Sequence, residues 1–263
     1  MKAFPLGAFV AVICAVLVTG ALVLIGQSGL TSVLPLAVIM AVCWGLTRYS
    51  RREIGFRWGT QRGLALAIAH PLLVLGVLTG LALLVGERQA SEQTGMAVAV
   101  NLAVIFLLTF VLGLITEEGF FRGWLWANLK RAGASDVAVI VLTSVAFSLW
   151  HAPEVLFSPE FSLPPLQAVI LLSNAVVIGC IWGLLRAISG SLVLTSLCHG
   201  LWNAGAYVLF GDGASPGALG LTDTRWFGPE HGALGLLLNV AVLALLWRAW
   251  QSSWRKDAIA QEA

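Results

Sequence analysis

The 263-residue sequence contains little charge, because Asp, Glu, Lys and Arg together make up 11% of it while apolar residues make up 59%. An ordinary soluble domain carries about 25% charged residues. The low charge therefore excludes such a domain and predicts an integral membrane protein. The formal net charge of +2 gives no indication of a nucleic-acid partner.

The sequence also lacks the patterns of disulfide-built and classical zinc proteins. Its four cysteines form no C-x-x-C pair, and Cys14, Cys43 and Cys180 lie in apolar runs, where they are expected to pack as small apolar side chains. No H-E-x-x-H motif, internal repeat, soluble domain or low-complexity segment is present. These absences exclude a disulfide framework and a zinc-binding motif on one helix, and they give no support to a transporter built from two matching halves.

Long apolar segments are what the sequence has in abundance. A bilayer core requires about 20 helical residues, and segments of suitable length occur at about 4–25, 30–46, 63–85, 96–129, 136–156, 166–186, 190–210 and 231–250. We predict an all-α, polytopic membrane protein with about eight transmembrane helices in a single membrane domain, residues 1–263. The fourth segment would be about 50 Å long against a core of about 30 Å, so it should be tilted, broken or partly interfacial.

The basic residues predict the orientation. With the N-terminus in the cytoplasm, twelve of the 15 basic residues lie on the inside: Lys2, Arg48, Arg51, Arg52, Arg57, Arg62, Lys130, Arg131, Arg186, Arg248, Arg255 and Lys256. Only Arg88 and Arg225 lie outside, where the loops hold seven acids: Glu87, Glu92, Glu154, Glu160, Asp212, Asp223 and Glu230. The positive-inside rule therefore predicts cytoplasmic N- and C-termini and a multi-pass protein of the plasma (inner) membrane.

Few ionisable side chains remain at membrane depth, where each charge costs at least about 2.5 to 3.5 kcal/mol. They are Glu117, Glu118 and Arg122 in the fourth segment, His151 in the fifth and His199 in the seventh. Counting 1.5 Å per residue from the cytoplasmic ends places Glu117, His151 and His199 about 20, 22 and 14 Å deep. We therefore expect them to converge on one site near the middle of the membrane.

Helical spacing assigns partners within this set. Residues four apart share a helix face, so Glu118 can pair with Arg122, which leaves Glu117 to point elsewhere. His199 and Asn203 share a face in the same way. The set suits hydrolysis without a serine or cysteine nucleophile: Glu117 as general base on a water held by His151, and His199 with Asn203 as donors to an oxyanion.

Three motifs carry a family resemblance: "EEGFFR" (Glu117, Glu118, Arg122), "FSLWH" (Phe147, His151) and "HGLWN" (His199, Asn203). In this order, inside membrane segments, they resemble the CAAX-protease and bacteriocin-processing (CPBP, or Abi) family of intramembrane glutamic endopeptidases over about residues 96–210. The resemblance implies a metal-independent protease with no cofactor. It implies that Glu117 and His151 activate the water, that His199 and Asn203 form the oxyanion hole and that Glu118 and Arg122 support the site. The implied partner is a membrane-associated protein or peptide in the lipid bilayer.

Alternative interpretations remain open from the residues alone. Intramembrane acids, histidines and arginines also line ion and small-molecule transporters. Glu117, His151 and His199 are also a possible zinc ligand set for a metal-dependent membrane protease, and a binding scaffold is a further possibility. His70, next to Pro71, has no partner motif and is expected to have a packing or kink role, while His231 is expected to be solvated near the last helix.

Overall fold

The computed structural model describes residues 5–27, 30–87, 93–159, 163–211 and 216–262, with side chains up to 252 apart from those at positions 30 and 32. Several charges used for the orientation lie outside the described residues or side chains: Lys2, Arg88, Arg255, Lys256, Glu92, Glu160 and Asp212. Within the described ranges the chain is helical, and its one β contact is an isolated bridge between Gly211 and Pro216.

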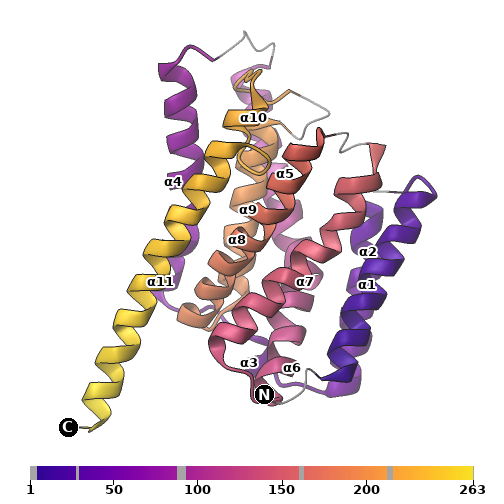
Figure 1. Ribbon diagram of the computed structural model, residues 1–263, viewed down its shortest axis with the longest axis vertical. Coiled ribbons are helices and arrows are strands. Elements are labelled where there is room, and N and C mark those ends of the chain that lie inside the picture. The colour runs from indigo at the N-terminus through magenta and orange to yellow at the C-terminus, as the bar shows by residue number, and fades with distance from the viewer. Residues whose placement is uncertain (1–4, 28–29, 88–92, 160–162, 212–215, 263) are drawn as a thin grey trace.

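The helices form a bundle whose members run along one common direction (Figure 1). In chain order they are α1 (Leu6–Leu24), α2 (Leu30–Thr47), α3 (Arg51–Ile54), α4 (Gln61–Leu84), α5 (Gly95–Ile115), the π-helix η1 (Glu118–Leu125), α6 (Trp126–Arg131), α7 (Asp136–Phe157), α8 (Pro165–Ser189), α9 (Leu192–Gly205), the π-helix η3 (Ala206–Phe210), α10 (Thr224–Phe227) and α11 (Ala233–Glu262).

Seven of the described helical segments are long and apolar enough to cross a membrane, and α2 is a shorter apolar helix at the position of the second expected span. The all-α, polytopic fold is thus confirmed. Helix α1 begins and α11 ends at the same end of the bundle, as an even number of crossings requires (Figure 1). The segment from Gly95 to Arg131 is broken, as its length predicted, because α5 stops at Ile115.

Polar residues at the helix ends explain where the helices begin. Thr60, Thr94, Ser135 and Ser191 each accept a hydrogen bond from the backbone three residues later, which satisfies an N–H group that the first turn leaves free. Gly190 ends α8 in the left-handed region at φ 65°, a conformation that glycine adopts without strain. The Gly190–Ser191 pair therefore turns the chain directly from α8 into α9.

Helix α9 occupies the centre of the bundle, packed against α5, α4 and α8, while α7 packs against α8 and α1. The apolar side chains of α5 that face away from α9 are exposed, including Val104, Leu107 and Val111. In a membrane this face is in contact with lipid, since a lipid-facing helix has no need for a polar face. The opposite side of α5 therefore borders the space between α9 and α7.

Candidate active site

The break after α5 positions the acidic pair. Thr116 leaves the helical region with φ −118° and ψ −93°, and Glu117 then leads into the π-helix η1. A π-helix contains a wider turn than an α-helix and is often found at functional sites. The break and the wide turn place Glu117 and Glu118 on different sides of the chain, toward different partners.

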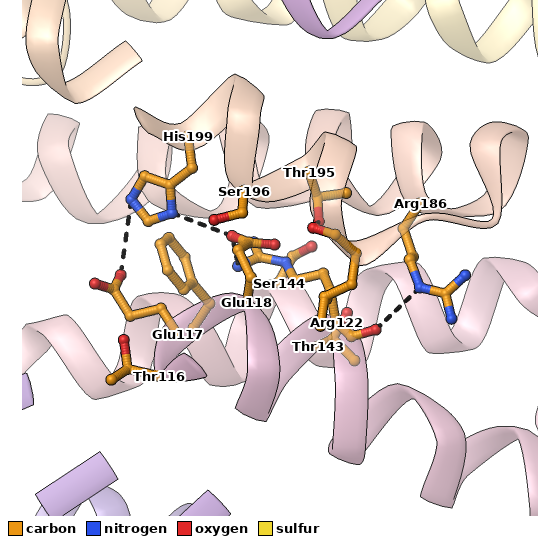
Figure 2. Close-up of polar contacts among 12 residues, drawn as sticks. Thr116, Glu117, Glu118, Arg122, Thr143, Ser144, Arg186, Thr195, Ser196 and His199 are labelled. Carbon is orange, nitrogen blue, oxygen red and sulfur yellow. Dashed lines mark hydrogen bonds and ion pairs between the residues drawn. The ribbon is translucent and has the colours of Figure 1, made fainter. Parts of the chain in front are cut away.

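Glu118 lies at the centre of a fully buried polar cluster (Figure 2). Its Oε1 is 3.1 Å from Arg122 Nη1 and 3.2 Å from His199 Nδ1, and the side chains of Glu118 and Arg122 have no exposed surface. The Arg122 guanidinium also lies 4.2 Å from the centre of the Phe147 ring. The predicted Glu118–Arg122 pair is therefore present, and it contacts His199 as well, which the spacing alone did not indicate.

Glu117 faces the histidines of two other helices. Its Oε2 is 3.9 Å from His151 Nε2 and 3.9 Å from His199 Nε2. These separations exceed the reach of about 2.6 to 3.2 Å for a direct hydrogen bond, so one water molecule fits between the carboxylate and each ring. The Glu117 side chain is 14% exposed, whereas Glu118 is 0% exposed. The two adjacent acids thus differ in environment.

Each histidine ring is held by contacts on its other side. His151 donates from Nδ1 to the carbonyl of Phe147 at 2.9 Å, which directs Nε2 toward Glu117. His199 stacks on Trp182 with ring centres 4.2 Å apart, and its Nδ1 contacts Glu118. Such supporting contacts fix the orientation of a reactive imidazole. Asn203, one turn after His199, is buried and lies on the same face of α9.

A cavity of about 410 Å³ connects these groups. Glu117, His151, His199 and Asn203 all line it, together with an apolar stripe of α5: Ile105, Leu108, Leu112 and Gly113. From Glu117 the lining continues to the end of the bundle where α7 and η3 end and where α8 and α11 begin. The six predicted site residues thus fall into two sets: four that line the cavity, and Glu118 with Arg122 buried behind it.

Sequence reasoning missed three residues that line the cavity. The sequence places Glu154 and Glu230 in external loops, but Glu154 is 6% exposed on α7 and both residues line the cavity. The prediction that His231 is solvated is wrong, because this residue is 6% exposed and lines the cavity as well. The spacing H-x-x-E between His151 and Glu154 was a usable signal, since residues three apart share a helix face. No local pattern indicates that the Pro229–His231 turn folds back into the site.

His70 has no partner motif in the sequence, but the structure gives its ring hydrogen-bond partners on other helices. The His70 Nε2 donates a hydrogen bond to Asn239 at 3.0 Å, and its Nδ1 accepts a hydrogen bond from the Cys198 thiol at 3.5 Å. Asn239 donates to Asn174, whose amide donates at 2.9 and 3.0 Å to the carbonyls of Pro229 and Glu230. The expected packing role is supported, because the His70 ring stacks on Trp202 with centres 5.2 Å apart.

These bonds close a ring of polar contacts behind α9, because Glu230 Oε1 accepts from Trp202 Nε1 at 2.9 Å. Cys198 and Trp202 are the residues of α9 that belong to this ring. Each is directly followed in the sequence by a predicted site residue, His199 and Asn203 respectively. A buried polar network that is broken costs more than its separate bonds. The ring therefore fixes the rotation of α9 and holds the Glu230 turn against the cavity.

The described residues contain no group of three or more His, Cys, Asp or Glu side chains arranged to hold a metal ion. What the arrangement offers is a carboxylate between two imidazoles, with an amide donor nearby, in a cavity largely enclosed by apolar side chains. Such a set can move a proton and stabilise negative charge on a carbonyl oxygen.

Residues 99–205 match the family model described as Type II CAAX prenyl endopeptidase Rce1-like. Searches of curated proteins and of solved structures gave no significant match. The matched segment contains all three motifs and all six predicted site residues. Over residues 99–205, less than half of the chain, the sequence is therefore similar to the Rce1-like family of CAAX-type membrane endopeptidases, the family that the three motifs resemble.

Proposed function

We propose that the protein is an intramembrane glutamic endopeptidase that hydrolyses a peptide bond of a membrane-associated protein or peptide, with residues 96–210 as its catalytic core. The observation that carries the proposal is the position of Glu117, whose Oε2 lies 3.9 Å from both His151 Nε2 and His199 Nε2 at the wall of the cavity. No metal or other cofactor takes part in the reaction as we propose it.

In the proposed reaction a water molecule lies between Glu117 and His151. Glu117 removes a proton from this water as its oxygen attacks the carbonyl carbon of the substrate. The negative charge that develops on the carbonyl oxygen is stabilised by hydrogen bonds from His199 and Asn203. The carbon–nitrogen bond then breaks, and the proton held by Glu117 passes to the leaving amine.

His199 needs protons on both ring nitrogens in this role. Its Nδ1 is occupied by Glu118 at 3.2 Å, so a hydrogen bond to the substrate must come from Nε2. The carboxylates of Glu117 and Glu118 lie on either side of the ring and compensate its positive charge. Glu118 and Arg122 therefore support the chemistry through His199 without facing the cavity.

The proposed surroundings follow from the topology. The positive-inside rule places the termini in the cytoplasm of a cell whose plasma membrane contains the protein. The cavity extends from Glu117 toward the opposite end of the bundle, so the proposed site is reached from the outer half of the membrane. The proposed substrate is thus a membrane-anchored segment near the outer surface.

The test is cleavage of membrane-anchored peptides by the purified protein in proteoliposomes, with products identified by mass spectrometry. The isosteric change Glu117→Gln should lower cleavage by at least about 100-fold, because it removes the general base. Glu53→Gln, at a carboxylate paired with Arg131 away from the cavity, is the control and should cleave like the unchanged protein.

Adding a chelator to the same assay tests the alternative that the protein is a zinc-dependent protease. Cleavage that stops with chelator and returns on addition of zinc would contradict the glutamic mechanism. Full activity of Glu117→Gln would contradict the role of Glu117, whatever the metal dependence.

A further inference from the structure

The cavity contains acids but no permanent cation among the described residues that line it. Glu117, Glu154 and Glu230 contribute carboxyl groups, and the described lining includes no Lys or Arg. Glu118 differs, because Arg122 neutralises its charge within 3.1 Å and neither residue lines the cavity. Among side chains other than histidine, the described charged groups that line this cavity are therefore all acidic.

The acids extend from the proposed chemistry toward the entrance. Glu117 lies at the inner wall, whereas Glu154 near the end of α7 and Glu230 in the turn before α11 lie nearer the open end of the bundle. Glu230 also borders a smaller adjoining cavity that His199 and Asn203 share. A substrate segment that reaches Glu117 must therefore pass or rest beside these two acids.

His231 provides an independent indication that a ligand binds here. It is 6% exposed and lines the cavity, and its Nε2 has no hydrogen-bond partner among the described residues. A buried polar atom without a hydrogen-bond partner is energetically unfavourable, and a bound peptide group can supply the missing hydrogen bond. Burial lowers the pKa of His231 below its usual value, so this ring adds a hydrogen-bonding group without adding positive charge.

In the low-dielectric surroundings of these acids, the sign of the charge on a substrate strongly affects its binding. Charges interact several times more strongly in a partly apolar site than in water. Burial raises the pKa of Glu230 above its usual value, which reflects the cost of holding its negative charge without a nearby cation. A cationic group on the substrate removes this cost, whereas a second carboxylate increases it.

We propose that the cavity selects a peptide segment with a Lys, an Arg or a free amine close to the scissile bond over a segment with an acidic side chain at that position. The proposal rests on the proposed peptidase function and specifies its substrate class. Glu230 and Glu154 are then the specificity-determining residues, and Glu117 performs the chemistry beside them.

The test uses lipid-anchored peptides of one sequence in proteoliposomes. Three versions place Lys, Gln or Glu beside the cleaved bond. We expect kcat/KM to be about tenfold higher for the Lys peptide than for the Gln peptide, and lower again for the Glu peptide.

Glu230→Gln is the informative variant because glutamine retains an oxygen that can accept from Trp202. With Glu154→Gln in the same chain, the ratio of kcat/KM for Lys over Gln should fall toward one. Asp223→Asn is the matched control, since it removes a carboxylate at the same end of the bundle that does not line the cavity. The control should retain the ratio of the unchanged protein.

Binding separates this inference from the peptidase function. Photo-crosslinking of the same three peptides to the Glu117→Gln protein reports charge selection without cleavage. Preferential crosslinking of the Lys peptide without cleavage by the unchanged protein would overturn the peptidase function and leave the charge selectivity standing. Glu117-dependent cleavage with equal rates for the three peptides, or preference for the Glu peptide, would overturn the charge selectivity alone.

Discussion

Glu118 and Glu117 are neighbours in the sequence, yet their surroundings give them different tasks. Glu118 is 0% exposed and contacts both Arg122 and His199, whereas Glu117 is 14% exposed at the cavity wall. A buried ion pair is costly to break because the remaining charge is left without compensation. Glu118 should therefore affect folding more than Glu117 does.

We predict that Glu118→Gln lowers the free energy of unfolding by about 3 kcal/mol, since Arg122 then keeps a buried charge without its counter-ion. Denaturation in detergent, followed by tryptophan fluorescence, measures this change. Glu117→Gln is the control and should unfold close to the unchanged protein. Unchanged stability of Glu118→Gln would show that the pair is not structural.

Glu230 gives a prediction about pH. Burial raises its pKa, so the carboxyl is neutral at low pH and gains its charge as the pH rises through that value. Preference for the Lys peptide over the Gln peptide should thus increase with pH. Effects of pH that act equally on both peptides cancel in this ratio.

The measurement is the pH profile of the kcat/KM ratio for the Lys and Gln peptides. In Glu230→Gln the profile should become flat, while Asp223→Asn should keep the rise. A rise that persists in Glu230→Gln would assign the titration to a different carboxyl group.

At the scale of an element, the π-helix η1 is the feature that separates the two acids. Gly119 allows η1 to pack closely against Leu114 and Met40, because a Cβ added there would lie 2.8 Å from the Leu114 carbonyl oxygen and 2.8 Å from Met40 Cε. The methionine can move, but the backbone oxygen is part of the chain that forms the turn. A side chain at this position must therefore displace the segment that carries Glu117.

We predict that Gly119→Ala destabilises the protein by about 1 to 3 kcal/mol, the usual cost of forcing extra atoms into a packed site. Cleavage should fall as well because Glu117 moves relative to the two histidines. Gly76→Ala is the matched control, since a Cβ there would meet nothing within 4 Å. Thermal unfolding and peptide cleavage by both variants test this, and equal behaviour of the two would refute it.

Sequence reasoning was most successful where the information is local. Apolar length predicts the helices, and four-residue spacing predicts the Glu118–Arg122 pair and the shared face of His199 and Asn203. It failed for contacts made across the bundle. The partner of His70 is Asn239, 169 residues away, and Glu230 enters the cavity through a turn with no periodic pattern. The convergence of Glu117 with His151 and His199 was predictable only because the membrane supplies a common depth scale.

At the scale of the whole molecule, the orientation in the membrane determines from which side a substrate can enter the cavity. The cavity extends toward the end of the bundle that carries α10, and α1 begins and α11 ends at the opposite end (Figure 1). Cytoplasmic termini would thus place the entrance outside the cell. The opposite orientation would expose the same acids to cytoplasmic substrates, so topology decides which substrates can reach the site.

We predict that, in intact cells, a membrane-impermeant maleimide labels Arg225→Cys but labels Lys130→Cys only after permeabilisation. Both side chains are suitable reporters, because Arg225 is 74% exposed in α10 and Lys130 is 43% exposed at the other end, in α6. The parent protein controls for its four cysteines, of which Cys198 is buried and Cys14 is exposed on the apolar face of α1. The reverse labelling pattern would place the acidic cavity in reach of the cytoplasm and would overturn the proposed outer-surface substrate, while the geometry of Glu117 and its two histidines would be unaffected.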